Sequence, residues 1–74
     1  GTTFRYKGAA GKKVEIKIFN LAGKLVRTLS KDGGDTIFWD GRDVNNNLVS
    51  PGLYLYLYFI NKKKEQRQIL QITN

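Results

Sequence analysis

The chain has 74 residues, contains neither cysteine nor histidine, and carries a net charge of +7. At this length we expect a single domain, residues 1–74, with a small core. Without cysteine or histidine, the chain has no disulfide, no thiolate metal site and no histidine-based catalysis, so we expect no enzyme, no catalytic residue and no cofactor. Its apolar content of 41% is too high for a disordered segment, and no apolar run is long enough for a membrane span.

The first half of the chain predicts three strands. Residues 2–6 form a short terminal strand in this interpretation. In residues 12–19, apolar side chains alternate with charged ones, which is the pattern of a half-buried strand. Gly23 lies in a turn sequence, and residues 24–29 resume strand-forming types, so the two segments predict a β-hairpin.

The second half predicts three further strands. Residues 35–39 are β-branched and aromatic, and an Asp-Gly turn follows them. Residues 53–60 are almost entirely apolar, and residues 61–64 provide the connection to a closing strand at 67–72. No segment has the three-and-four spacing of an amphipathic helix. Helices are therefore not expected.

These elements predict an all-β fold, a small antiparallel Ig-like (fibronectin III-like) β-sandwich. Six strands are expected, or seven if residues 48–49 pair briefly. The basic residues are dispersed over strands and turns, apart from a short run at 62–64, and lysines at such places keep strand edges soluble. The charge therefore does not by itself predict a nucleic-acid site.

The strand at 53–60 is unusual because neither of its faces is polar. Alternation places three tyrosines on one face and four apolar residues on the other. One face must be core, and the other needs cover, either from loops of this domain or from a neighbouring domain or subunit. The predicted interaction surface consists of Leu53, Leu55, Leu57 and Phe59.

A second group of residues is predicted to be structural: Trp39, Asp40, Gly41, Gly52 and Tyr54. We expect Trp39 to fill the core beside Tyr54 or Tyr56, and Asp40 to accept backbone N–H bonds within its own turn. The functional alternative is a stacking platform, in which Trp39 and the tyrosines bind single-stranded nucleic acid or a glycan while lysines 62–64 hold phosphate.

The polar loop after this turn contains weak calcium candidates: Asp40, Asp43, Asn45 and Asn47. Three of them alternate as in the first half of an EF-hand loop. The sixth position of that template is Leu48 instead of Gly, however, and the twelfth is Tyr54 instead of Glu. We therefore favour a loop held by side-chain-to-backbone bonds, and expect no bound metal.

The order of these motifs resembles that of two related bacterial families. The run VEIKIFNLAGKLVRTL, the Trp-Asp-Gly turn at 39–41 and the Gly-Leu-Tyr at 52–54 are similar to the Ig-like domain of flagellar hook-capping proteins. They are equally similar to the C-terminal sorting domains of type IX secretion substrates. The resemblance covers about residues 12–72. Where these families have Asp-x-x-Gly, this chain has Asp43 followed by three Asn, with Asn in place of the Gly that tolerates left-handed geometry.

The resemblance implies a non-catalytic extracellular module of a larger secreted bacterial protein, exported through the periplasm to the cell surface. Its role there would be sorting, anchoring or spacing. The partners implied are a neighbouring domain, a subunit or the secretion machinery, with no nucleic acid and no membrane insertion. The alternative is a homo-oligomeric building block of an extracellular filament or surface assembly, completed by strand exchange at an open edge.

Overall fold

The computed structural model describes residues 1–8 and 10–73, and of residues 65–67 the backbone alone. The described residues form antiparallel β-structure without a helix, which confirms the all-β prediction. No helix that could cross a membrane occurs among them. The strands are β1 (Thr2–Arg5), β2 (Lys13–Phe19), β3 (Leu25–Asp32), β4 (Thr36–Trp39), β5 (Gly52–Ile60) and β6 (Lys63–Ile72).

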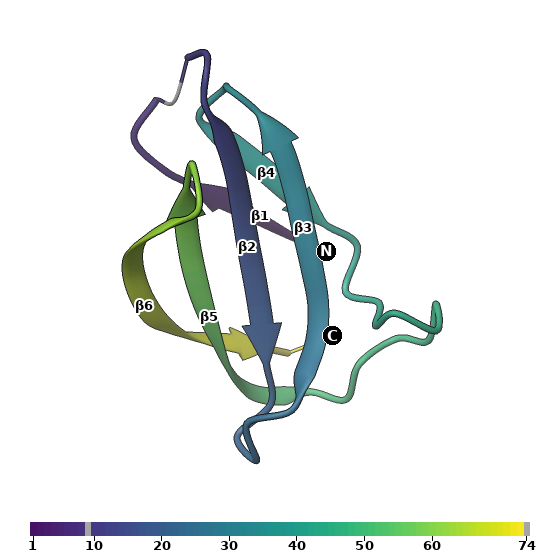
Figure 1. Ribbon diagram of the computed structural model, residues 1–74. Coiled ribbons are helices and arrows are strands. Elements are labelled where there is room, and N and C mark those ends of the chain that lie inside the picture. Colours follow the sequence, from purple (N-terminus) through teal and green to yellow (C-terminus); the bar gives the residue numbers. More distant parts are fainter. Residues whose placement is uncertain (9, 74) are drawn as a thin grey trace.

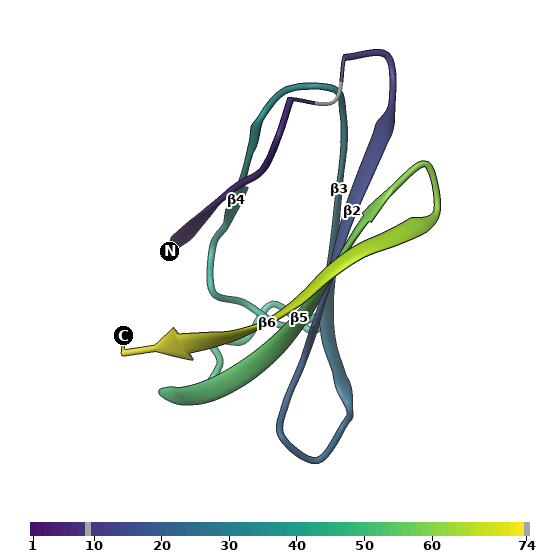
Figure 2. The same cartoon turned by 90° about the vertical axis from the view of Figure 1, so that its left-hand side faces the viewer.

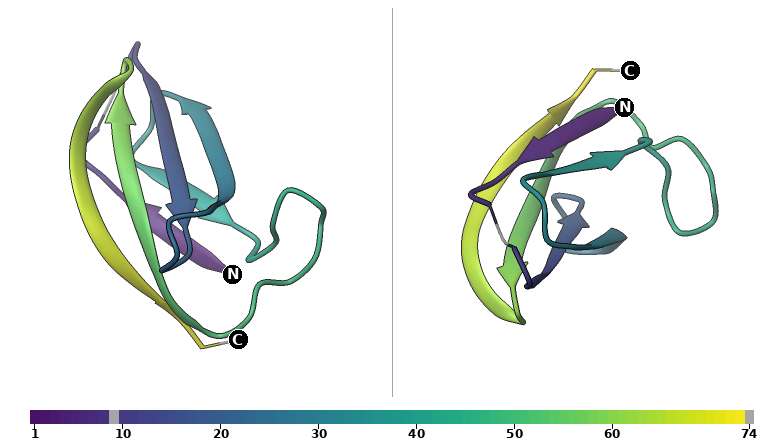
Figure 3. Two further views of the ribbon diagram at one scale, coloured as in Figure 1. Left: turned by 60° about the horizontal axis from the view of Figure 1, so that its bottom comes forward. Right: turned by 90° about the horizontal axis from the view of Figure 1, so that it is seen from above.

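The strands form two antiparallel sheets. The larger sheet has the order β3-β2-β5-β6, and the smaller one pairs β1 with β4 (Figure 1). Seen from the side and from above, the smaller sheet lies across one face of the larger one (Figures 2 and 3). The chain leaves the larger sheet after β3, crosses to β4, and returns through residues 40–51 to β5. The core lies between the two sheets.

Strand β2 is central because it pairs with both β3 and β5. Its residues Val14, Ile16 and Ile18 are fully buried, while the charged residues between them face the opposite side of the sheet. This is the alternation that predicted the strand, and it fixes which face of the larger sheet meets the smaller one.

Aromatic contacts join the two sheets. The Phe4 ring of β1 meets the Tyr56 ring edge-on, with centroids 4.8 Å apart, and the Tyr6 ring lies 5.3 Å from that of Tyr58. Trp39 of β4 meets Tyr54 edge-on at 6.4 Å. The tyrosine face of β5 therefore belongs to the core, and aromatic pairs of this kind add about 0.5–1.5 kcal/mol each beyond the area that they bury.

The closing strand begins earlier than the sequence predicts. Asn61 and Lys62 have φ angles of 48° and 68°, so the connection is a tight two-residue turn of the kind whose twist matches a β-hairpin. Because the turn is so short, Lys63 already belongs to β6, and the expected start at residue 67 is wrong. Residues 48–49 do not add a strand; only an isolated bridge between Arg42 and Leu48 forms there.

Replacing Trp39 tests the core. The side chain is fully buried, and its indole N–H donates to the carbonyl oxygen of Arg42 at 3.0 Å. Trp39→Ala is expected to lower the free energy of unfolding by about 3–5 kcal/mol, measured by urea denaturation followed by circular dichroism. The control is Phe38→Ala in the same strand, where the side chain is 64% exposed and the loss should be about 1 kcal/mol or less. Equal losses would contradict this account of the core.

The tyrosines predict how stability depends on alkaline pH. Burial raises the pKa of Tyr56 above its ordinary value of 10.0, and burial together with the charge of Asp35 raises the pKa of Tyr6. The unfolded chain therefore loses these protons first, so the stabilisation is complete below pH 10 and is lost as pH rises through the folded-state pKa values. The free energy of unfolding should fall above pH 10 less steeply in Tyr56→Phe than in the wild type. Parallel curves for the two proteins would show that Tyr56 does not contribute.

Candidate interaction surface

The leucine face of β5 lies on the side of the larger sheet opposite to the core. The strand register places Phe19 of β2 and Ile69 of β6 on either side of Leu55, so the apolar surface extends over three strands. Leu53 is 48% exposed and Ile69 is 69% exposed, while the others are half-buried. We call this surface the outer apolar patch; it consists of Phe19, Leu53, Leu55, Leu57, Phe59 and Ile69.

No strand of the described part of the chain packs on the outer apolar patch. The smaller sheet covers the opposite face, and the contacts between the two sheets run from β3 to β4 and through the core aromatics. The long connection 40–51 runs beside β3 and then into the start of β5 (Figure 1), where Tyr54, which lies on the core face, donates to the carbonyl oxygen of Ser50. The leucine face was expected to be covered either by loops of this domain or by a neighbouring domain or subunit. In the described residues, no loop of this domain covers it.

One cation lies over the edge of the outer apolar patch. Lys17 is opposite Leu57 in the register, and its Nζ is 5.5 Å from the centroid of the Phe59 ring. Its methylene stem can cover apolar surface while the ammonium group stays in water. Glu15, opposite Phe59, is the neighbouring charge on the same face of β2. The patch is therefore an apolar surface with a charged margin along β2.

The turn after β4 is held by charged and polar bonds. The Oδ1 atom of Asp40 accepts the backbone N–H of Arg42 at 3.0 Å and pairs with the Arg27 guanidinium at 3.2 Å. The same guanidinium donates to the carbonyl oxygen of Arg42 at 2.9 Å, beside the indole N–H of Trp39. Gly41 has a φ of 78°, a conformation that side chains rarely adopt. The role of Arg27, which ties β3 to this turn, has no signal in the sequence.

The polar loop is organised around one carboxylate. The Oδ1 atom of Asp43 accepts the backbone N–H groups of Asn45 at 2.9 Å and of Asn47 at 3.1 Å. Asn46 has a φ of 66°, so an Asn does occupy the left-handed position for which Gly is usual. Arg42 closes the loop by donating to the carbonyl oxygen of Asn46 at 3.0 Å. Both carboxylates that were weak calcium candidates bind backbone amides in this structure.

Metal binding has no further support in the described residues, where no three His, Cys, Asp or Glu residues cluster. Asn45 and Asn47 enter the loop bonds described above through their backbone amides. The geometry supports a structural role for the loop.

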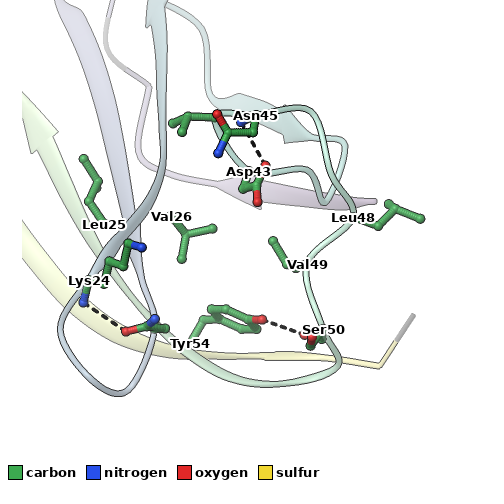
Figure 4. A pocket seen from close by; sticks show the side chains of 11 residues that line it. Lys24, Leu25, Val26, Asp43, Asn45, Leu48, Val49, Ser50 and Tyr54 are labelled. Atoms are coloured by element: carbon green, nitrogen blue, oxygen red, sulfur yellow. Dashed lines mark hydrogen bonds between the residues drawn. The ribbon is translucent and has the colours of Figure 1, made fainter.

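A cavity of about 290 Å³ lies between this loop and the β2–β3 turn (Figure 4). Tyr54 forms part of its lining, and its hydroxyl donates to the carbonyl oxygen of Ser50 at 2.6 Å. Val44 and Leu48 are 70% and 61% exposed at its margin, and Leu48 points away from the cavity (Figure 4). Neither residue is predicted from the sequence to form a surface, because exposed Val44 and Leu48 cannot be told there from Val49, which is buried in the core.

Comparison of the chain with protein-family models, curated proteins and solved structures gives no match.

The loop bonds predict the effect of removing the Asp43 carboxylate. Asp43→Ala leaves two backbone N–H groups without their acceptor and should lower the free energy of unfolding by about 1–2 kcal/mol. The matched control is Asn45→Ala, because the bonds to Asp43 use only the backbone amide of Asn45. Calcium chloride should leave the melting temperature of the wild type unchanged. A rise in melting temperature with calcium that Asp43→Ala abolishes would instead demonstrate a metal site.

Proposed function

We propose that this domain is a non-catalytic interaction module that acts by contact through the outer apolar patch. The observation that carries the proposal is the uncovered apolar face of β5, with Leu53 and Ile69 exposed. Soluble monomeric domains rarely leave a contiguous apolar patch of this kind open, and such patches usually mark a protein–protein contact. The occupant in this proposal is a neighbouring domain or subunit of an extracellular assembly.

The proposed fold is Ig-like. Two antiparallel sheets with an aromatic core support this assignment, and the contact of Trp39 in the smaller sheet with Tyr54 in the larger one joins the two layers. The resemblance to sorting domains gives the proposal its setting: a C-terminal sorting, anchoring or spacer domain of a secreted bacterial protein, displayed at the cell surface. The secretion machinery is then one of the partners that the patch would meet.

A stacking function for Trp39 and the tyrosines has less support. Base or sugar stacking needs ring faces that are open to solvent. Trp39 is fully buried, and Tyr54 and Tyr58 are buried on the core face of β5. Tyr56 is half-buried and its ring meets Phe4 edge-on, while the outer face of β5 is aliphatic apart from Phe59. These positions favour protein contact over nucleic-acid or glycan binding.

Strand completion in an assembly is a second candidate, and one observation favours it. The outermost strand of the larger sheet, β6, pairs on one side only in the described part of the chain. A strand supplied by another chain would complete the sheet, as in other systems that bind by strand addition. This candidate uses the edge of the sheet, whereas the principal proposal uses its face.

A surface-display experiment tests the principal proposal. The chain is fused behind a reporter protein in a bacterium that has type IX secretion, and surface-exposed reporter is compared with reporter retained in the periplasm. We expect display with the wild-type domain and periplasmic retention with Leu55→Lys/Leu57→Lys, because two ammonium groups in the middle of the patch must be desolvated on contact.

The matched control is Thr28→Lys, an exposed position on the same face of the sheet but on β3, opposite Lys17. It should be displayed like the wild type, and circular dichroism should show that all variants fold. Retention of the wild-type fusion would refute the sorting role. Display of the double variant at the wild-type level would show that the outer apolar patch is not the contact surface.

A further inference from the structure

The outer edge of β6 is a second unpartnered feature, distinct from the outer apolar patch. In the described residues, β6 pairs with β5 along one side and with no strand along the other. An edge strand presents unpaired backbone N–H and C=O groups that another chain can pair with. Residues 68–72 of this edge carry no charge and no proline, which are two of the features that normally protect an edge. This half of β6 is therefore an open template for strand addition.

The opposite edge of the same sheet is better protected. Strand β3 contains Arg27, Lys31 and Asp32, and its pairing with β2 has a register shift after Ile18. The side chain of Lys31 also bonds the carbonyl oxygen of Thr36 in the other sheet at 3.0 Å. Charges, an irregularity and a neighbouring strand all obstruct pairing there. Strand addition to the larger sheet is thus directed to β6.

A cavity of about 290 Å³ lies between β1 and the inner side of β5 and β6. Rings from both sheets line it, namely those of Phe4, Tyr6, Tyr56 and Tyr58. Gln68 of β6 closes it on the edge side and accepts a 2.6 Å bond from the Tyr56 hydroxyl. Directly opposite residues on paired strands lie about 4.5–5.5 Å apart. A side chain opposite Gln68 on an added strand would therefore reach this cavity, where an aromatic or aliphatic group could pack against the rings that line it.

The charged residues that line the cavity are positive, although the charge of Asp35 acts on Tyr6, one of the lining residues. Arg5 and Lys7 belong to its lining, and no acidic residue is among the described residues that line it. The chain as a whole carries a charge of +7. Complementary charge raises the association rate and excludes partners of the same sign. The electrostatics therefore favour a segment with carboxylates beside the apolar residue.

We propose that the edge of β6 and the adjoining cavity accept an extended, acidic and apolar segment of another protein as an additional strand. Backbone bonds to residues 68–72 hold the segment, one apolar side chain enters the cavity, and carboxylates two residues away, on the same face of the added strand, meet Arg5 and Lys7. This site adds to the proposed contact function a second surface and the chemistry of its partner. It rests on the proposed function in one respect, namely that the domain acts by contact with another protein.

A second copy of this chain is a poor occupant. None of its strands has a net negative charge: Glu15 of β2 and Asp32 of β3 are each outnumbered by basic residues of the same strand, β4 and β5 carry no charge, and β6 is net positive. Two copies with a charge of +7 each also repel one another. The partner is therefore a different, acidic polypeptide.

A peptide-binding experiment tests this inference. The probe is a fluorescently labelled peptide of the length of β6, 10 residues, in which Glu stands two residues before and two residues after a central Phe, on the same face of the strand, and Val or Thr fills the other positions. A matched peptide has Lys in place of every Glu. We expect the acidic peptide to bind in fluorescence anisotropy, the basic one not to bind, and hydrogen exchange to show new protection at the amides of residues 68–72.

Matched charge reversals locate the site on the protein. Lys7→Glu should weaken binding of the acidic peptide by at least about fivefold, because an attraction becomes a repulsion. Lys24→Glu makes the same change of net charge in the β2–β3 turn, away from this cavity, and should change binding by less than about twofold. Both lysines are exposed, so neither variant is expected to unfold the domain.

The remaining outcomes overturn the proposal. Equal binding of the two peptides, no binding at millimolar concentration, or protection confined to β5 would each rule out the acidic strand site. Concentration-dependent dimerisation with protection of residues 68–72 would identify a second copy as the occupant instead. Surface display that depends on Leu55 and Leu57 without any peptide binding would leave the proposed function intact and refute this inference alone. Peptide binding without such display would support the strand site at β6 and refute the proposed function of the outer apolar patch.

Discussion

The burial of Trp39 between the two sheets is the contact on which the rest of the structure depends. A domain of 74 residues without disulfides has a small core, so the largest buried side chain contributes a large share of its stability. The ring packs on Tyr54, while its N–H group holds the carbonyl oxygen of Arg42, which Arg27 also binds. One residue thus connects the sheets, the turn after β4 and strand β3. The polar loop that follows is connected to Trp39 through Arg42, whose side chain donates to the carbonyl oxygen of Asn46.

The fold was predictable in those segments where a local sequence pattern, such as alternation or a turn motif, determines the structure. Alternation in β2 identified both a strand and its buried face, and the aromatic Trp39 with an Asp-Gly turn identified a core residue followed by a chain reversal. The closing strand was misjudged because lysines are typical of turns, whereas the backbone angles of Asn61 and Lys62 compress the turn to two residues. The start of β6 is therefore set by the backbone conformation of the turn and not by the residue types in it.

The candidate site was only partly readable from the sequence. Period-two alternation predicts that Leu53, Leu55 and Leu57 share a face, but it does not tell which strands flank them. Phe19 and Ile69 join the patch only through the pairing of β5 with β2 and β6, which are distant in sequence. The cavity beside β6 depends in the same way on how β1 crosses the larger sheet. Long-range pairings of this kind leave no local trace in a sequence.

The pairing of β2 with β5 has a consequence for when the domain can fold. Val14 pairs with Ile60 and Phe19 with Leu55, so the central ladder of the sheet joins distant parts of the chain. Such non-local contacts slow folding, because the entropy of a long loop must be lost before the strands stabilise each other. A chain emerging in order therefore remains without its central ladder until β5 has appeared. The outer apolar patch, which spans β2, β5 and β6, is therefore assembled only when the last strands have formed.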